Sequence, residues 1–236
     1  MTHLRARPWG DHAGPPMTVA LMNDYEVIVR GLERMLSPYA DLIRIVELDA
    51  GMPVGRPVDL SLYDTFALSQ IDSDDIDTVL ANPDSGRVVV YSWNTHAELV
   101  AVARRKGVRG YLTKSLSAAD LVDALQRIHA GEIVISAEPE GPQPHWEPSA
   151  GPDLWPGQNY GLSGREAEVL ALIAQGLTNE QIAARMYLSI NTVKTYIRSA
   201  YRKIDVTSRP NAVIWGMSHD LAPGRGRRIR VTRPTA

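Results

Sequence analysis

The sequence predicts an α/β domain at the front of the chain and an all-α domain at the back, on three observations. Short apolar runs alternate with amphipathic stretches over residues 17–131. Residues 132–160 are acidic and contain six prolines, which predicts a linker between domains. Residues 161–221 carry helical spacing throughout. A chain of 236 residues is long enough for two small domains of this kind.

Composition and charge narrow the function classes. Residues 1–130 hold 13 basic and 17 acidic residues, whereas residues 161–236 hold 12 and 5, so the two parts are expected to meet different partners. The absence of Cys excludes disulfide frameworks, thiolate zinc sites and Cys nucleophiles. Residues 1–16 lack the apolar core of a signal peptide and no run of about 18 apolar residues occurs. We therefore expect a disordered N-terminal arm and a cytoplasmic protein with no membrane partner.

The front segment predicts a doubly wound parallel sheet of five strands, because near-continuous apolar strands are typical of a sheet covered on both faces. The expected strands are Thr18–Met22, Leu42–Val46, Val58–Tyr63, Val88–Tyr91 and Arg109–Leu112. The expected helices are Val27–Leu36, Ala97–Lys106 and Ala118–Ala130. Between the second and third strands only Leu48–Pro57 remains, which is short and broken by glycine and proline. The domain is therefore expected to lack one crossover helix.

Polar residues follow the predicted strands at their carboxyl ends. They are Asn23, Asp24, Asp64, Ser92 and Lys114. Parallel strands bring such residues to one rim of the sheet, where ligands bind in open α/β folds. Carboxylates suit Mg²⁺, and a hydroxyl and an ammonium suit phosphoryl oxygens. Taken singly, an acidic residue after a strand is usually a helix cap and a lysine is usually a solvated surface charge, so only their joint placement predicts a site.

The back segment predicts four helices. Ser163 with Glu166 and Thr178 with Gln181 fit the capping-box pattern, and Gly176 is placed to end the first helix. The following helices are expected over Asn179–Met186, over Asn191–Ile204 and from Ser208 onward. The tail, residues 222–236, has five arginines among Gly and Pro and is expected to be disordered. It would either attract DNA phosphates or serve as a solvated end.

The third of these helices separates into two faces. At 100° per residue its apolar side chains form one stripe, made of Val193, Ile197, Ala200 and Ile204. The opposite face holds Asn191, Lys194, Thr195, Arg198 and Arg202. For an isolated helix this would be a solvated basic face. As the second helix of a helix–turn–helix unit, it is presented to a DNA major groove.

The runs Val19–Asp24, Pro57–Asp64, Val88–Ser92 and Gly110–Lys114 resemble the receiver domain of two-component response regulators, a flavodoxin-like fold, over roughly residues 17–131. The resemblance implies phosphorylation on Asp64, Mg²⁺ at Asp24 and Asp64, phosphoryl contacts from Ser92 and Lys114, and Tyr111 as an aromatic switch. The chain departs from the pattern in three respects: Asn23 replaces an acidic residue, the usual Pro after Asp64 is missing, and one crossover helix has no room. An atypical phosphorylated receiver and a pseudo-receiver kept for dimerisation or ligand sensing both remain open.

The runs Leu162–Leu170, Gln175–Ala183, Asn191–Ile197 and Arg202–Ile204 resemble the LuxR-type DNA-binding domain. Together the two resemblances point to the NarL/FixJ class of response regulators. They imply base contacts from Lys194, Thr195 and Arg198, with the fourth helix pairing two domains. The residues implied to lie near phosphates are Thr192, Tyr196, Tyr201 and Lys203.

These observations predict a sequence-specific transcription regulator and not an enzyme. It would bind inverted half-sites in double-stranded DNA as a homodimer, with a sensor histidine kinase as a possible partner. A protein-interaction adaptor without specific DNA binding is the alternative, which the basic face disfavours. An Asp-nucleophile phosphatase is disfavoured because Phe66 stands where such enzymes carry a second Asp.

Overall fold

The computed structural model describes residues 15–23, 25–50, 54–66, 75–136, 154–222 and 227–229. Of residues 47–50, 75 and 227–229 it describes the backbone alone. The predicted N-terminal arm up to residue 14 and residues 137–153 of the predicted linker lie outside the described residues, as does Asp24.

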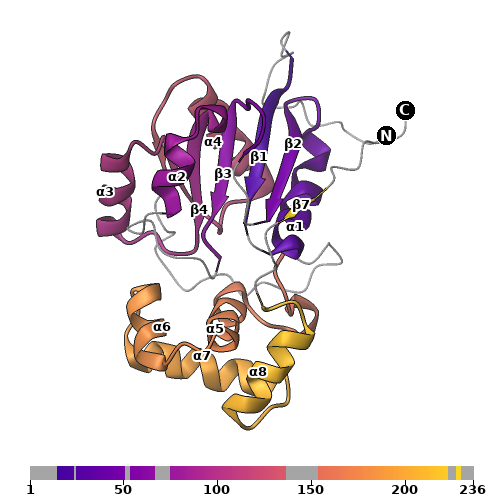
Figure 1. Ribbon diagram of the computed structural model, residues 1–236, viewed down its shortest axis with the longest axis vertical. Coiled ribbons are helices and arrows are strands. Elements are labelled where there is room, and N and C mark those ends of the chain that lie inside the picture. Colours follow the sequence, from indigo (N-terminus) through magenta and orange to yellow (C-terminus); the bar gives the residue numbers. More distant parts are fainter. Residues whose placement is uncertain are drawn as a thin grey trace, which may run out of the picture.

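The front part of the chain forms a sheet in the order β6-β5-β4-β3-β1-β2-β7 (Figure 1). Its strands are β1 (Met17–Met22), β2 (Ile43–Ala50), β3 (Leu60–Asp64), β4 (Arg87–Ser92), β5 (Gly110–Thr113), β6 (Val134–Ile135) and β7 (Arg227–Ile229). β1 to β6 pair in parallel, and β7 pairs antiparallel with β2. The parallel sheet and its five predicted strands are confirmed, and β6 and β7 extend the sheet at its two edges.

Helices cover both faces of this sheet, as near-continuous apolar strands require. In β1, Val19 and Leu21 belong to one core together with α1 (Glu26–Leu36) and α4 (Ala118–His129). Ala20 and Met22 belong to a second core together with α2 (Asp75–Ala81) and α3 (Ala97–Lys106). The alternation of these two pairs follows the two-residue period of a strand. The helix predicted over 97–106 is confirmed with the same bounds.

The missing crossover helix is confirmed in the part that the structure describes, since none of residues 54–59 is helical. Val54 and Val58 are buried and pack in the same core as Ile76 of α2. Asn82 fixes this segment, because its Nδ2 donates a hydrogen bond to the Val54 carbonyl at 2.8 Å. A non-helical segment therefore fills the space that a helix would otherwise cover.

The back part is a four-helix domain whose helix starts are set by side-chain caps. The helices are α5 (Gly164–Ala174), α6 (Asn179–Met186), α7 (Ile190–Lys203) and α8 (Arg209–Ser218). Both predicted capping boxes are present, Ser163 with Glu166 and Thr178 with Gln181. Gly176 follows α5 with a φ of 88°, a left-handed conformation that glycine adopts without strain.

The helical domain lies against the carboxyl ends of the parallel strands, with α5 on the sheet side and α7 on the far side (Figure 1). The chain then returns to the sheet, because Arg227–Ile229 forms β7 at the free edge of β2. This corrects the expectation of a wholly disordered tail. Gly and Pro content predicts disorder, whereas pairing of the backbone with a strand edge depends on tertiary contacts that composition does not predict.

Candidate functional site

Asp64 ends β3 at the rim of the sheet that faces the helical domain, and its side chain is buried and hydrogen-bonded through Oδ1. The residue is 1% exposed. Its Oδ1 accepts hydrogen bonds from the Lys114 Nζ at 2.5 Å, the Phe66 backbone N–H at 2.8 Å and the Asn23 Nδ2 at 3.2 Å. Two of the predicted partners of Asp64, Lys114 and Asn23, are therefore brought together with it.

Asn23 presents its amide nitrogen, and not its oxygen, to this pocket. Its Nδ2 also donates to the Asp64 carbonyl at 3.0 Å, and its Oδ1 accepts from the Tyr25 backbone N–H at 2.8 Å. The amide orientation is thus set by donors and acceptors on both sides. A hydrogen-bond donor stands where the family pattern places a second carboxylate.

Among the described residues, this pocket offers few ligands to a divalent cation. Mg²⁺ prefers oxygen ligands, commonly one or two carboxylates. The described residues offer a single carboxylate, Asp64, which already accepts from an ammonium and an amide. No group of three or more His, Cys, Asp or Glu that could hold a metal occurs among the described residues. Asp24, the other predicted ligand, lies outside the described part of the chain.

Apolar side chains close the pocket over Asp64. The cavity above the carboxylate has a volume of about 30 Å³, room for roughly one water molecule. Its apolar lining comes from α1, from the strand ends and from residues 154–155, namely Ile28, Leu32, Met35, Phe66, Tyr91, Trp93, Leu154 and Trp155. The rings of Trp93 and Trp155 meet edge to face at 6.1 Å. Burial raises the pKa of the Asp64 carboxyl, and the Lys114 ammonium only partly opposes that effect.

Ser92 and Tyr111 are joined to the helical domain through Asn94. The Ser92 Oγ accepts from the Thr65 Oγ1 at 2.7 Å and from the Asn94 backbone N–H at 3.0 Å. The Tyr111 hydroxyl donates to the Asn94 carbonyl at 2.6 Å, and burial raises the pKa of Tyr111 to about 12. The Asn94 Nδ2 then donates to the Met186 carbonyl at the end of α6, at 2.9 Å. Sequence reasoning missed Thr65 and Asn94. Thr65 directly follows Asp64, and Asn94 lies two residues after Ser92.

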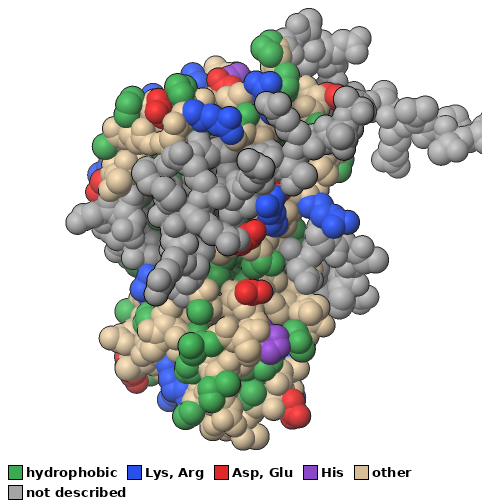
Figure 2. Space-filling view, turned by 45° about the vertical axis from the view of Figure 1, so that its right-hand side comes forward, with side chains coloured by type: hydrophobic (Ala, Val, Ile, Leu, Met, Phe, Trp, Pro, Cys, Tyr) green, Lys and Arg blue, Asp and Glu red, His purple; other side chains and the backbone are tan. Residues whose placement is uncertain are grey.

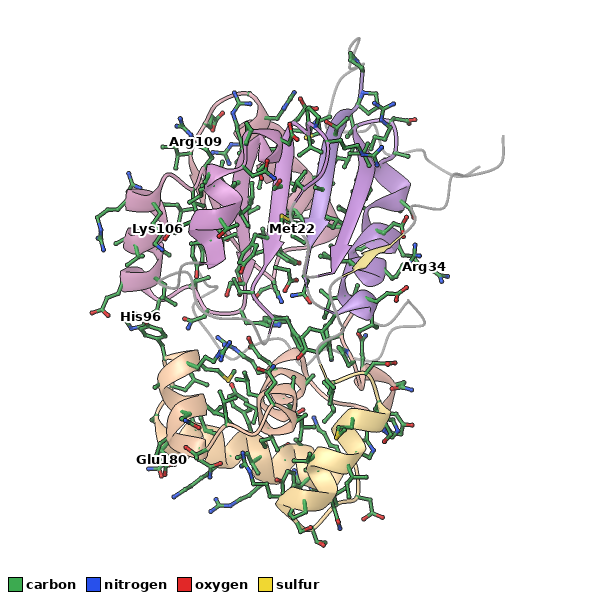
Figure 3. All side chains as sticks on the ribbon, in the orientation of Figure 1. Met22, Arg34, His96, Lys106, Arg109 and Glu180 are labelled. Carbon is green, nitrogen blue, oxygen red and sulfur yellow. The ribbon has the colours of Figure 1, made fainter. Side chains whose placement is uncertain are left out.

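The start of α5 contacts the same loop. The Arg165 Nη2 donates to the Trp93 carbonyl at 2.5 Å, and a Cβ placed on Gly164 would lie 2.5 Å from the Trp93 ring. Further along the junction, His96 lies between α3 and α6 and its ring is 5.8 Å from that of Tyr187 (Figure 3). The helical domain therefore packs on the loop that follows Ser92.

The predicted DNA-contacting face of α7 is exposed and points away from the core. The exposed members are Asn191, Lys194, Thr195, Arg198, Arg202 and Lys203, and the half-buried members are Thr192, Tyr196 and Tyr201. Val193, Ala200 and Ile204 of the predicted stripe are buried, and Ile197 is half-buried. Ser189 caps the helix through the Thr192 backbone N–H. Among the described residues no ion pair engages Arg198 or Arg202.

Lys203 is engaged within the protein. Its Nζ donates to the Glu166 Oε2 at 2.6 Å, which joins the end of α7 to the start of α5. Burial acts to raise the pKa of Glu166, but hydrogen bonds from Lys203, Ser199 and Ser163 outweigh it and hold the pKa below its usual value. Sequence reasoning placed Lys203 near DNA phosphates and missed this pairing.

Hydrophobic side chains gather on the surface of the helical domain (Figure 2). On α8, Ile214 is 65% exposed and Met217 is 66% exposed, and Tyr160 nearby is 44% exposed. Residues three apart on a helix share one face, so Ile214 and Met217 form a single apolar surface.

The described helices include none that is both long and apolar enough to cross a membrane.

A parallel α/β domain with Asp, Ser and Lys at its carboxyl rim, joined to a helix–turn–helix domain, is the arrangement of two-component response regulators. Residues 161–216 match the bacterial regulatory proteins of the luxR family. The chain is 31% identical over 205 residues to the nitrate/nitrite response regulator protein NarL of Escherichia coli (strain K12), covering 85% of this chain and 94% of that protein. It therefore belongs to the NarL/FixJ class of response regulators.

Two further proteins illustrate the likeness. The response regulator protein VraR of Staphylococcus saprophyticus subsp. saprophyticus is 28% identical over 212 residues, which cover 87% of this chain and 99% of that protein. Among solved structures, the response regulator ChrA of a heme-sensing two-component system aligns at 25% identity over 88% of this chain and 100% of that chain, with a TM-score of 0.42.

Proposed function

We propose that this response regulator binds specific DNA sites as a homodimer through α7 and thereby regulates transcription, acting in the cytoplasm. The observation that carries the proposal is the exposed polar face of α7, with Arg198 and Lys194 on it and Val193 and Ala200 buried behind it. A helix in this position of a helix–turn–helix unit inserts into the major groove, where Arg pairs with guanine as the commonest specific contact.

In this proposal the two copies of the homodimer contact each other through α8. Ile214 and Met217 expose apolar area on one face of this helix, and burying that area against a second copy is favourable. Two identical domains related by a two-fold axis read inverted half-sites about 10 base pairs apart. The arrangement accounts for the exposed apolar side chains of α8.

The test compares Arg198→Ala with Arg105→Ala, an exposed arginine on α3 of the receiver. Arg198→Ala is expected to cost about 1–3 kcal/mol on the specific site and to relax base preference there, whereas Arg105→Ala leaves binding unchanged. Fluorescence anisotropy on specific and random duplexes measures both losses, and footprinting reports the half-sites. Equal loss on specific and random DNA, or a footprint on one unrepeated half-site, would contradict the proposal.

For the front domain we propose an atypical receiver in which Asp64 accepts a phosphoryl group, from a sensor histidine kinase or a small phosphodonor, slowly and with little help from Mg²⁺. Three observations support this: the carboxylate is buried, Lys114 and Asn23 already engage it, and Trp93 and Trp155 cover it. In this proposal Lys114 stabilises the incoming phosphoryl charge.

The test is intact-mass measurement after incubation with a small phosphodonor and Mg²⁺, with Asp64→Asn as the control. Slow addition of one phosphate in the wild type and none in Asp64→Asn is expected. No addition in the wild type at any time would favour a pseudo-receiver, and rapid stoichiometric addition would identify an ordinary phospho-switch.

A further inference from the structure

Contacts from α5 and α6 dock the helical domain on the receiver. The Asn94 Nδ2 donates to the Met186 carbonyl at the end of α6, at 2.9 Å. The Arg165 Nη2 at the start of α5 donates to the Trp93 carbonyl at 2.5 Å. Both receiver residues belong to the loop that follows β4, next to the pocket of Asp64.

This docking covers Asp64 with a segment that belongs to the helical domain. Trp155 lines the Asp64 pocket, and its Nε1 donates to the Leu162 carbonyl just before α5, at 2.8 Å. Tyr160 ties the same segment to α8, because its ring meets the Trp215 ring edge to face at 5.2 Å. We therefore expect residues 154–162 to move with the helical domain and to uncover Asp64 when the two domains separate.

The side of the helical domain that faces away from the receiver stays uncovered. α6 ends near His96 at the junction and begins on the opposite side of the domain, where Glu180 lies (Figure 3). Lys194 of α7 is exposed and acts electrostatically on the Glu180 carboxylate, which places Lys194 on that side too. On α8, Ile214 and Met217 are exposed as well. Docking therefore leaves free both the side of α7 proposed to contact DNA and the face of α8 proposed to pair two copies.

We propose that inhibition between the two domains runs in one direction: the docked helical domain blocks phosphoryl transfer to Asp64, whereas the docked protein binds DNA. The inference rests on the proposed functions of Asp64 and α7. In the blocked step an Asp64 carboxylate oxygen bonds to the phosphorus of an acyl phosphate. The bond from phosphorus to the donor oxygen breaks, and the carboxylate of the donor leaves with the electron pair.

Docking and DNA binding are then independent equilibria. A bound group shifts a conformational equilibrium only if its affinity differs between the two states. DNA meets the same exposed side of α7 in the docked and the undocked protein, so its affinity for one domain is the same in both. Because coupling is reciprocal, opening the junction changes the labelling of Asp64 without changing the affinity of one domain for one half-site.

The test locks the junction in the full-length protein. The chain has no native Cys, so His96→Cys/Tyr187→Cys provides two thiols, placed where the two rings lie 5.8 Å apart. A short bismaleimide joins the thiols, and the same variant with each thiol capped by N-ethylmaleimide is the matched control. Intact mass confirms one crosslinker per chain and follows labelling by acetyl phosphate with Mg²⁺. Fluorescence anisotropy measures binding to one specific half-site.

We expect the locked protein to be labelled about tenfold more slowly than the capped control, because labelling requires the undocked state. Its affinity for the half-site should stay within about twofold of the control. Equal labelling rates in the two forms, or loss of DNA binding on locking, would overturn the inference.

Two further measurements separate this inference from the proposed function. If the capped control fails to be labelled or to bind the half-site, the corresponding proposed function fails. Access to α7 is then measured by acetylation of Lys194 with an amine-reactive ester, and covering of the receiver loop by amide exchange at Trp93 and Asn94. Equal acetylation with slower exchange in the locked protein supports docking that covers the receiver alone. Slower acetylation, or equal exchange, contradicts it.

Discussion

At the scale of single residues, Asn23 determines the chemistry of the pocket. Its amide nitrogen donates to the Asp64 carboxylate, so it occupies an oxygen lone pair that a cation would otherwise coordinate. An Asp at this position would replace a donor by an acceptor and add a negative charge beside Asp64. Mutual repulsion of two carboxylates is relieved by a bound cation.

Asn23→Asp is therefore expected to raise Mg²⁺ affinity about tenfold or more, equivalent to about 1.4 kcal/mol. Isothermal titration calorimetry of the wild type and the variant measures the two dissociation constants. Asn211→Asp, the same chemical change at an exposed position on α8, is the control and should leave Mg²⁺ affinity unchanged. Equal affinities for wild type and Asn23→Asp would mean that the residue at position 23 does not limit metal binding.

Trp155 is the residue that couples the segment before the helical domain to Asp64. It is 5% exposed, and its Nε1 donates to the Leu162 carbonyl at 2.8 Å, which fixes the indole over the pocket. Burial raises the pKa of Asp64, and a protonated carboxyl is not a nucleophile. Because the pKa of Asp64 is higher in the folded state, protonation of Asp64 stabilises the folded protein. This stabilisation is present at low pH and is lost as the pH rises through the raised pKa.

Trp155→Ala is expected to speed phosphodonor labelling of Asp64 severalfold and to move the pH profile of labelling to lower pH, because water enters the pocket and the pKa falls. In the wild type, labelling should rise with pH as Asp64 ionises. Intact-mass time courses across a pH series measure both effects. Ile133→Ala, which truncates an apolar side chain that is 49% exposed, is the control and should leave the profile unmoved.

At the scale of elements, Glu166 holds α5 and α7 together. Its side chain closes the capping box at the Ser163 backbone N–H and accepts from Lys203 at the end of α7. The pKa of Glu166 is lowered in the folded state, so its stabilising contribution is present above the usual pKa of a glutamate. That contribution is lost as pH falls through the lowered pKa.

Glu166→Gln keeps the capping geometry, as Gln181 does in α6, but loses the charge opposite Lys203. We expect a loss of about 1 kcal/mol in the free energy of unfolding at neutral pH, which disappears in acid. Denaturant unfolding at several pH values measures it. Lys203→Met should cost a similar amount, and the double variant should cost less than the two together. Additive losses would show that the pair makes no joint contribution.

At the scale of the whole molecule, the contact of α5 with the loop after Ser92 sets the domain arrangement. Gly164 lies against the Trp93 ring, so any side chain at position 164 must displace that ring. Gly164 is the first residue of α5 and its φ is not positive, so Ala fits the helical backbone there. A substitution here acts on docking and not on the helix.

Gly164→Ala is expected to loosen the two domains and to expose Asp64, without lowering the stability of the helical domain. Small-angle scattering should show a larger radius of gyration, and phosphodonor labelling should speed up. Gly164→Ala/Trp93→Leu restores the space and should return the radius towards the wild-type value. An unchanged radius in Gly164→Ala would mean that the contact does not control docking.

Much of the fold was predictable from local patterns. The capping boxes at Ser163 and Thr178 and the apolar stripe of α7 involve residues three or four positions apart, and the structure has each of them. The strands were predictable because each apolar run is buried on both faces. α2 was missed because it spans seven residues, too few for a clear period. Parallel topology then brought Asp64 and Lys114 to one rim, as the strand ends indicated.

The remaining features depend on contacts between distant parts of the chain. Trp155 covers Asp64, Lys203 pairs with Glu166, Asn94 bonds to Met186 and Arg227–Ile229 pairs with β2. The spacing of residues in the sequence does not predict such contacts. Each partner fits the helix, strand or loop pattern around it whether or not the other partner is present. Packing of one domain on the other brings them together, and the burial that results also changes the chemistry of Asp64. A carboxylate that the sequence places at an open rim becomes, in the folded molecule, a covered group with a raised pKa.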